Sequence, residues 1–495
     1  MKRGLGLMAW LVGVIALTGC AVGSDYRPPA APQVTRFTAE PLPAATSGGS
    51  TEQDRAQRFL DAAVLPLDWW TLLGSAELDV LVERALRHSP TIAAAQASLR
   101  RAQEMVATQS GTFFPSVLAG YSPIRARVPD TTSSPLSSGA SVYTLHTAQL
   151  SVTYLADVFG GNRRALESLQ AQSESQAWQL RAGQLTLAAN VVSAALQEAS
   201  LREQLAATEQ LSNMAERQLH LLQAQRRLGA ASGGAVLAQE ALLRQAEAAA
   251  AGQKKQLALQ RDLLSVLVGA LPVELSAQTL RFSALRLPDV PTGLPAQLIE
   301  QRPDVRSAEA QLHSANADVG VAVANMLPQI TLSANYGSGA QALAQLFNGG
   351  SLLWSAGANL AQPLFQGGSL WHRKRAAEAQ FEFTLAQYQI TVLGAFQNVA
   401  DSLEAARYDA DQHIATLSQE AAAAASLRIA QRQLELGDIS VLTLLNAESA
   451  FLQATIARIQ AQANRYNDIV AVYQALGGGW GQATPAQPAD GTRQR

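Results

Sequence analysis

Few residues in this chain of 495 residues are of a type and spacing that could do chemistry. The histidines are scattered without metal-ligand spacing, so surface or packing roles suit them better. The glycine stretches at 159–162 and 347–351 lack the lysine-bearing context of a phosphate loop. No nucleophile–base pattern supports a hydrolase, so we expect no enzyme, no catalytic residue, no bound metal and no dissociable cofactor. The six histidines are His88, His146, His220, His313, His372 and His413.

The remaining reactive group is the thiol of Cys20, the only cysteine of the chain. Lys2 and Arg3 form a basic head, and residues 5–16 are apolar. A basic head, an apolar run and a small-residue exit predict a secretory signal peptide over residues 1–19. The run is shorter than the roughly 20 residues of a comfortable membrane span. The alternatives are a plain signal peptide with an accidental cysteine, or a short anchor helix.

An odd cysteine in an exported chain has no internal disulfide partner and needs another use. Residues 17–20, Leu-Thr-Gly-Cys, resemble the bacterial lipobox. That resemblance implies that the signal is cut before Cys20, which then carries S-diacylglycerol and an N-acyl group. Several acyl chains anchor a protein firmly, because each buried CH₂ contributes about 0.8 kcal/mol. We then expect an extended or loosely ordered tether over residues 20–66 and a disordered polar tail over 480–495.

Composition narrows the possible functions. The formal net charge is −2, and removal of Lys2 and Arg3 makes it about −4. Nucleic-acid binding would need a clearly basic face, so nucleic acid is excluded as a partner. Charged residues make up 15% of the chain, below the roughly 25% usual for soluble domains. No stretch after Cys20 reads as a transmembrane helix.

The chain contains two copies of one sequence repeat, over residues 67–288 and 289–479. At an offset of 213 residues Pro90 matches Pro303 and Pro115 matches Pro328. At an offset of 208 residues the Leu-Gly pair at 228–229 matches the pair at 436–437. Chance similarity among alanine-rich helices is the alternative, and the paired prolines and Leu-Gly pairs argue against it. A small length change separates the two offsets, as a single duplication predicts.

Each repeat predicts a helix, a strand pair, a very long helix and a shorter return helix. The first repeat begins with short helices that end near residue 109. Each long helix has about 65 residues and a length of roughly 100 Å. Uncapped helices of this length suggest coiled-coil packing, and a soluble coiled-coil rod is the alternative. The predicted ranges are strands within about 115–157 and helices 163–227 and 235–268, then helix 303–325, strands within about 328–363, and helices 369–435 and 441–476.

The strand pairs alternate apolar and small polar residues over about 10 positions, which is typical of a tilted outer membrane strand. A lipid-facing sheet must close, because an open edge in hydrocarbon leaves backbone groups unpaired. The smallest such barrels have about eight strands. One chain offers four, so we expect at least two copies, and this argument does not select three. The predicted lipid-facing positions are Leu150, Val152, Tyr154, Ile330, Leu332, Tyr336, Trp354 and Leu360.

These features together resemble the outer membrane factor family, in its lipoprotein branch that serves tripartite RND efflux systems. The resemblance rests on the lipobox with residues 21–29, the segment 67–90, the duplicated unit and the segment 434–449. The resemblance implies a mainly α fold with a transmembrane β part, in which a homotrimer shares a 12-stranded barrel and a long α-helical barrel. It also implies an outer membrane location with a long periplasmic part.

The same resemblance implies a passive exit duct for drugs or small toxic solutes. Its partners would be a periplasmic adaptor protein, an inner membrane RND-type transporter and outer membrane lipid. One alternative is the exit channel of a type I protein-secretion system, and another is a structural lipoprotein that braces the envelope without a pore. The transported compound is not readable from the sequence.

The resemblance places the turns at Gly229 and Gly437 at the periplasmic tip, where the pore closes. Family members often carry aspartates just after the second turn, whereas this chain has Thr443 and Asn446 there. Only Asp438 remains nearby, so we expect weak cation selectivity at the tip. The alternative role of Asp438 is a helix N-cap. A basic run at 372–375 is either a solvated helix face or a contact with acidic lipid headgroups.

Overall fold

The computed structural model describes residues 22–30, 32–51, 54–60, 65–129, 141–274, 280–292 and 302–479. The predicted signal peptide, Cys20 and the predicted tail lie outside these residues. The chain forms two compact units, the first made of Met1–Pro29, Ser98–Gln176 and Ala308–Tyr388 and the second of the remaining segments. The sequence repeats therefore do not coincide with the compact units, because each unit combines segments from both repeats.

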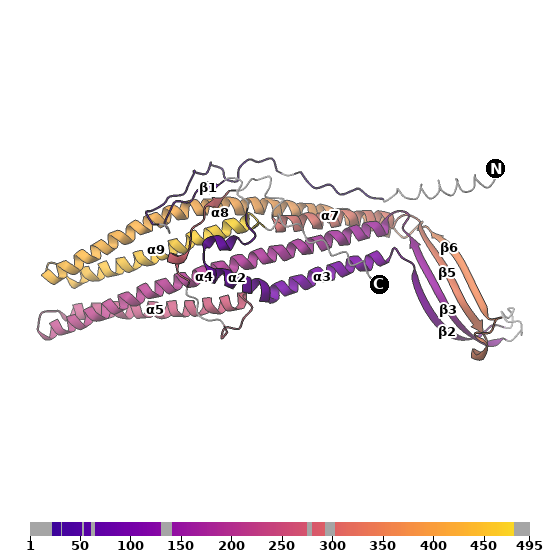
Figure 1. The fold of residues 1–495 in the computed structure, drawn as a ribbon, viewed down its shortest axis with the longest axis horizontal. Helices are drawn as coiled ribbons and strands as arrows, with labels where there is room; N and C mark the ends of the chain where they lie inside the picture. The colour runs from indigo at the N-terminus through magenta and orange to yellow at the C-terminus, as the bar shows by residue number, and fades with distance from the viewer. Residues whose placement is uncertain are drawn as a thin grey trace. The chain divides into compact units, whose positions relative to one another are not determined.

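A four-stranded antiparallel sheet forms one part of the first unit (Figure 1). Its order is β2-β3-β5-β6, so a strand pair from each repeat meets along β3 and β5. Within the described residues, β2 and β6 each have one edge without a strand partner. The strands are β2 (Ser116–Arg127), β3 (Val142–Ala156), β5 (Gln329–Ala340) and β6 (Leu352–Ala361).

The strand register sorts the side chains into two faces, because directly opposed residues of antiparallel strands share a face. Leu150 pairs with Tyr336, which pairs with Trp354. By the same register all eight predicted lipid-facing positions fall on one face. The other face carries mostly serine, threonine, asparagine and glycine, and its apolar exceptions are Leu118 and Ile124 of β2, Leu145 and Leu155 of β3 and Leu353 of β6. The sheet therefore has one apolar and one largely polar side.

Helical segments from both repeats complete the first unit. They belong to α3 (Pro90–Gly111), α4 (Gly161–Arg227), α7 (Pro303–Ala324) and α8 (Ser369–Leu436). Pro90 and Pro303 start their helices at the position where the missing proline N–H has no helical partner. Ser168 and Ser314 meet at 2.9 Å between their hydroxyl oxygens, and Ser98 donates to Gln176 at 3.0 Å. Small polar residues thus join these helices.

The second unit contains two helical hairpins and short connecting elements. Leu219 and Leu222 of α4 pack with Val236 and Leu243 of α5, and α8 packs with α9 around Leu444. Trp69 stacks on Tyr473 of α9, with 5.6 Å between ring centroids. The elements not yet named are β1 (Phe59–Leu60), η1 (Trp69–Leu73), α2 (Ala76–His88), α5 (Gly233–Leu267), η2 (Phe282–Ala284), β4 (Val290–Pro291), η3 (Leu343–Gln345) and α9 (Val441–Ala475). η3 belongs to the first unit.

The observed element ends differ from the predicted ranges by at most two residues for the long and return helices. The long helix predicted at 163–227 begins at Gly161, and that predicted at 369–435 ends at Leu436. Glycine and serine residues next to the hairpin turns mark these helix ends in the sequence. None of the described helices combines the length and apolar character needed to cross a bilayer.

Candidate functional site

The two hairpin turns have the same backbone structure, residue for residue. Gly229 and Gly437 adopt left-handed φ angles of 77° and 81°. The next residue, Ala230 or Asp438, donates its backbone N–H to the carbonyl five residues earlier, at 2.8 and 2.9 Å. This is the Schellman ending, which glycine favours because it lacks a Cβ. The sequence duplication is therefore a structural duplication at both turns.

Ser232 and Ser440 cap the return helices. The Ser232 hydroxyl accepts the N–H of Ala235 at 3.1 Å, and the Ser440 hydroxyl accepts that of Thr443 at 3.3 Å. The N-cap alternative for Asp438 is therefore wrong, because Asp438 already closes the end of α8 two residues before the cap. Asp438, Thr443 and Asn446 are all exposed.

The two turns line one cavity of about 910 Å³. Gln225, Ala230 and Ser232 contribute from the first hairpin, and Gly437 and Ser440 from the second. Val441 packs against the core of the α4–α5 hairpin, and Met214 of α4 packs against that of the α8–α9 hairpin. The structure thus brings the two hairpin turns, which the family resemblance places together at the tip, to the walls of one cavity. Their role in closing a pore stays a prediction.

Glu448 is a buried carboxyl group near this cavity that the sequence reading missed. It lies on α9 one turn after Leu444, and only 2% of it is exposed. Its Oε2 atom has no hydrogen-bond partner. Burial raises the pKa of Glu448 to about 7. The match between Glu448 and Glu240 was visible in the repeats, but nothing in the sequence marked one of them as buried.

Residues 22–26, which follow Cys20, are held by side chains of α4 and α7, so this part of the predicted extended or loosely ordered tether is not loosely ordered. Arg164, in the first turn of α4, donates to the carbonyl oxygens of Val22 and Gly23 at 3.1 and 3.3 Å and to Asp25 at 2.8 Å. Asn316 of α7 donates to the carbonyl oxygen of Ser24 at 2.9 Å. We call residues 22–26 with Arg164, Glu167, His313 and Asn316 the N-terminal clamp.

Side-chain packing and the charge of Arg164 both stabilise the N-terminal clamp. Tyr26 stacks on His313 with 4.4 Å between ring centroids. Gly23 has a φ angle of 97°, and a Cβ there would lie 2.8 Å from the Cα of Gly320, so glycine is required. Burial lowers the pKa of Arg164, but hydrogen bonds to Asp25 and Glu167 outweigh it and raise that pKa overall. Arg164 therefore stays charged where it binds the N-terminal segment.

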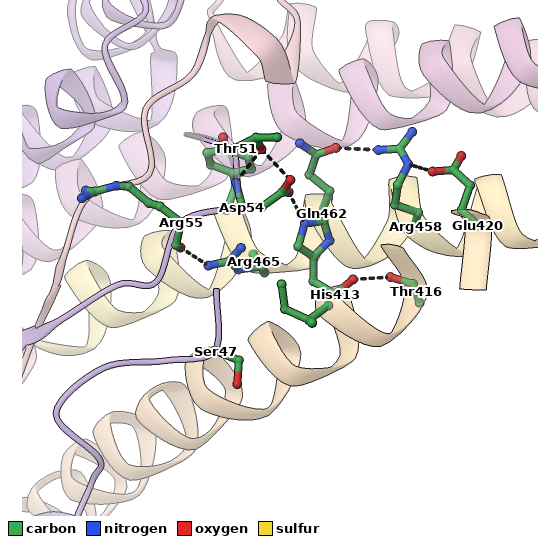
Figure 2. A network of polar contacts seen from close by, with 12 residues as sticks. Ser47, Thr51, Asp54, Arg55, His413, Thr416, Glu420, Arg458, Gln462 and Arg465 are labelled. Atoms are coloured by element: carbon green, nitrogen blue, oxygen red, sulfur yellow. Dashed lines mark hydrogen bonds and ion pairs between the residues drawn. The ribbon is translucent and has the colours of Figure 1, made fainter. Parts of the chain in front are cut away.

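A second contact of the N-terminal segment lies in the second unit, where it crosses α8 and α9. Figure 2 shows Asp54 beside His413 of α8, whose Nε2 lies 2.7 Å from Oδ1 of Asp54. Arg465 of α9 donates to the carbonyl oxygen of Arg55 at 3.1 Å and to the side chain of Gln57 at 3.2 Å. These polar groups hold residues 54–57 of the N-terminal segment against α8 and α9.

The electrostatics of this contact favour a neutral histidine and an ionised aspartate. Burial lowers the pKa of His413, although Asp54 opposes that effect. Burial of Asp54 disfavours its charge, but hydrogen bonds with Thr51 and His413 hold its pKa below the usual value. Burial also lowers the pKa of Arg465, two of whose nitrogens lack partners. His413 therefore has the packing role that the sequence predicted.

Two further carboxyl groups lie partly buried in the second unit. Burial raises the pKa of Asp468 to about 7, and the neighbouring carboxylate of Asp409 adds to the shift. Burial raises the pKa of Asp409 too. Within the described residues, no group of three or more His, Cys, Asp or Glu side chains is placed to hold a metal ion.

Comparison with known proteins identifies the fold. A sequence profile of the outer membrane efflux protein family matches residues 81–270 and 294–478. The pyoverdine export outer membrane protein OpmQ of Pseudomonas putida is 31% identical over 430 residues, which cover 85% of this chain and 89% of that protein. The toluene efflux pump outer membrane protein TtgC of the same species is 29% identical, covering 97% of this chain and 96% of its own length.

Solved structures agree with these relatives. The outer membrane channel OprN superposes with a TM-score of 0.82 at 27% identity, covering 93% of this chain and 100% of that channel. The CmeC outer membrane channel of Campylobacter jejuni has a TM-score of 0.86 at 21% identity and covers 94% of this chain and 96% of its own, which supports the fold. On these matches, the chain belongs to the outer membrane efflux protein family and is a channel component of the outer membrane.

Proposed function

We propose that three copies of this outer membrane efflux protein form the passive exit duct of a tripartite pump. The duct carries small toxic solutes or drugs across the periplasm and the outer membrane, and its helices form an α-helical barrel. The transport step needs no catalytic residue in this chain, because an upstream transporter supplies the energy.

The open sheet is the observation that carries this proposal. Its eight predicted lipid-facing residues share one face, and its edge strands β2 and β6 have no further strand partner within the described residues. An open edge is strongly unfavourable in hydrocarbon, where no water pairs with the backbone. Pairing of β2 in one copy with β6 in the next removes both edges. Three copies then supply a closed barrel of 12 strands.

The partners we propose are a periplasmic adaptor and an inner membrane RND-type transporter. Leu228 and Leu436, at the two hairpin turns, are 85% and 62% exposed. Such exposed leucines favour contact with another protein. The hairpin turns are then the tip at which the pore opens, with Gly229, Gly437, Asp438, Thr443 and Asn446 at its aperture.

The relatives favour efflux over protein secretion. Their names specify pyoverdine and toluene, which are small molecules. We therefore propose a small-molecule cargo for this channel as well, and we do not favour the type I secretion alternative. Weak cation selectivity follows from the neutral residues at positions 443 and 446.

Conductance of the purified protein tests the duct directly. We expect channels in planar bilayers and a native mass of three chains in detergent. A structural lipoprotein that only braces the envelope gives no conductance. A native mass of single chains contradicts the shared barrel. Drug susceptibility and secreted proteins of a deletion strain then separate efflux from protein secretion.

We also propose that Cys20 carries the lipid anchor predicted from its lipobox. The N-terminal clamp supports this, because it holds Val22 against the start of α4, a few residues beyond the end of β3. Acyl chains attached two residues before Val22 then enter the membrane close to the sheet.

Replacement of the thiol tests the anchor. We expect Cys20→Ser to abolish incorporation of labelled palmitate and to leave the signal peptide uncut by the lipoprotein route. The wild-type chain and a Ser24→Ala variant serve as controls that keep the thiol. Labelling of the Cys20→Ser chain at the wild-type level contradicts the assignment.

A further inference from the structure

The two long helices differ in whether the cations at their first turns have carboxylate partners. At the start of α4, the Asp157 carboxylate accepts the backbone N–H groups of Asn162 and Arg163 at 2.9 and 3.0 Å. The same carboxylate pairs with the Arg163 side chain at 3.3 Å. Arg164 pairs with Asp25 and Glu167. The cations in this first turn therefore have carboxylate partners within the chain.

At the start of α8, two of three neighbouring cations have no such partner among the described residues. His372, Arg373, Lys374 and Arg375 follow one another, and the first turn has no acidic residue. Lys374 pairs with Glu378 at 3.1 Å, but no ion pair is seen for Arg373 or Arg375 among the described residues. A helix N-terminus carries partial positive charge, so uncompensated cations are unfavourable there.

Exposed apolar side chains adjoin these cations. Leu364 and Phe365, just beyond the end of β6, are 92% and 90% exposed. Trp371 is half-exposed, and the guanidinium of Arg375 lies over its ring at 4.8 Å from the centroid. Exposed apolar and aromatic side chains and cations thus occur within a dozen residues after the end of β6. Aromatic and basic residues next to apolar ones are typical of a membrane–water interface.

We propose that this β6–α8 junction, made of Leu364, Phe365, Trp371, Arg373, Lys374 and Arg375, binds an anionic phospholipid at the periplasmic surface of the outer membrane. The lipid phosphate lies against Arg373 and Arg375, beside the Lys374–Glu378 pair, and supplies the negative charge that Asp157 supplies at the start of α4. Its acyl chains lie against Leu364 and Phe365. The inference rests on the proposed function, because it needs the apolar sheet face to contact lipid.

Lipid retention by the purified full chain tests this site. The protein is reconstituted in equal amounts of phosphatidylglycerol and phosphatidylethanolamine, and the retained lipids are counted by native mass spectrometry. We expect the wild type to retain phosphatidylglycerol preferentially. The variant Arg373→Gln/Lys374→Gln/Arg375→Gln loses that preference, by roughly fivefold for each cation removed.

A matched variant controls for net charge. Arg244→Gln/Lys254→Gln/Lys255→Gln removes three exposed cations from α5 and is expected to keep the preference. Equal loss in both variants, or no preference in the wild type, overturns the proposal. Displacement of the lipid signal by inorganic phosphate also overturns it, because the site then prefers a free anion.

Two further readouts separate other outcomes. Circular dichroism and native mass establish that the junction variant folds and assembles as the wild type does. Loss of assembly in that variant without preferential lipid binding in the wild type assigns the junction to a contact between copies instead. Conductance is measured on the same samples, so a conducting wild type without lipid preference refutes this site and leaves the proposed duct intact.

Discussion

Glu448 places a carboxyl group where helix packing leaves it little water and no partner for Oε2. Burial raises its pKa from 4.5 to about 7, so the folded protein holds this proton more tightly than the unfolded chain does. Its contribution to stability is therefore complete below about pH 4.5 and is lost as the pH rises through 7. The loss is about 3 kcal/mol at most.

We predict that Glu448→Gln removes this pH dependence. The amide resembles the protonated acid in shape, so the variant should match the wild type at pH 5 and melt at a higher temperature at pH 8. Thermal unfolding followed by tryptophan fluorescence measures the difference. The control is Glu240→Gln, which removes a half-buried carboxyl group at the matching position of the first repeat. Parallel profiles for wild type and Glu448→Gln would refute the argument.

Single residues also show the limit of sequence reasoning. Aspartate and serine both cap helices, and only the backbone closure at Gly437 decides that Ser440 performs this role instead of Asp438. The clamp was equally hidden, because Ser24 meets Asn316 across 292 residues of sequence. Local composition predicted an extended or loosely ordered segment, because composition contains no information about a partner so far along the chain.

At the scale of elements, the hairpins were the best-predicted part of the fold. Leu-Gly followed by serine three residues later occurs at both turns, and each pattern forms the same Schellman ending and serine cap. The strands were predictable because alternation of apolar and polar residues has a period of two. Burial within the long helices was not, because alanine-rich sequences present similar small residues on every side.

We predict that Gly437→Ala destabilises the tip by about 1 kcal/mol. The φ angle of 81° disfavours a Cβ, although the added atom would meet nothing within 4 Å. Hydrogen exchange of residues 433–445 reports the loosening. Gly394→Ala in the interior of α8, where there is also open space, should instead stabilise by up to about 1 kcal/mol. Equal effects of both changes would contradict the role of the turn.

For the whole molecule, the two open sheet edges decide whether one chain can form a closed barrel by itself. Strands lie about 4.8 Å apart, so β2 and β6 of one chain are separated by about 14 Å. A disulfide tolerates Cα separations of only about 7 Å. Any bond between cysteines on these strands therefore joins different copies, and the apolar sheet face offers exposed alanines for the purpose.

We predict that Ala119→Cys on β2, combined in turn with cysteines along β6 from 352 to 360, forms covalent dimers and trimers. Non-reducing gels of oxidised membranes measure the products, and at least one register should give trimers. The control pairs Ala119→Cys with Ala334→Cys on β5, which lies inside the sheet and should form no cross-links. Single chains at every register would contradict closure by neighbouring copies.

The N-terminal clamp also orders the assembly of the chain in time. Its partners come from α4 and from α7, and the contact of Ser24 with Asn316 of α7 spans 292 residues, so the clamp is complete only after α7 is in place. Until then the leading end has only its contacts with Arg164 of α4. Closure of the clamp is therefore a late folding event, so the acyl chains that we propose on Cys20 would reach the bilayer before the rest of the molecule takes its final place.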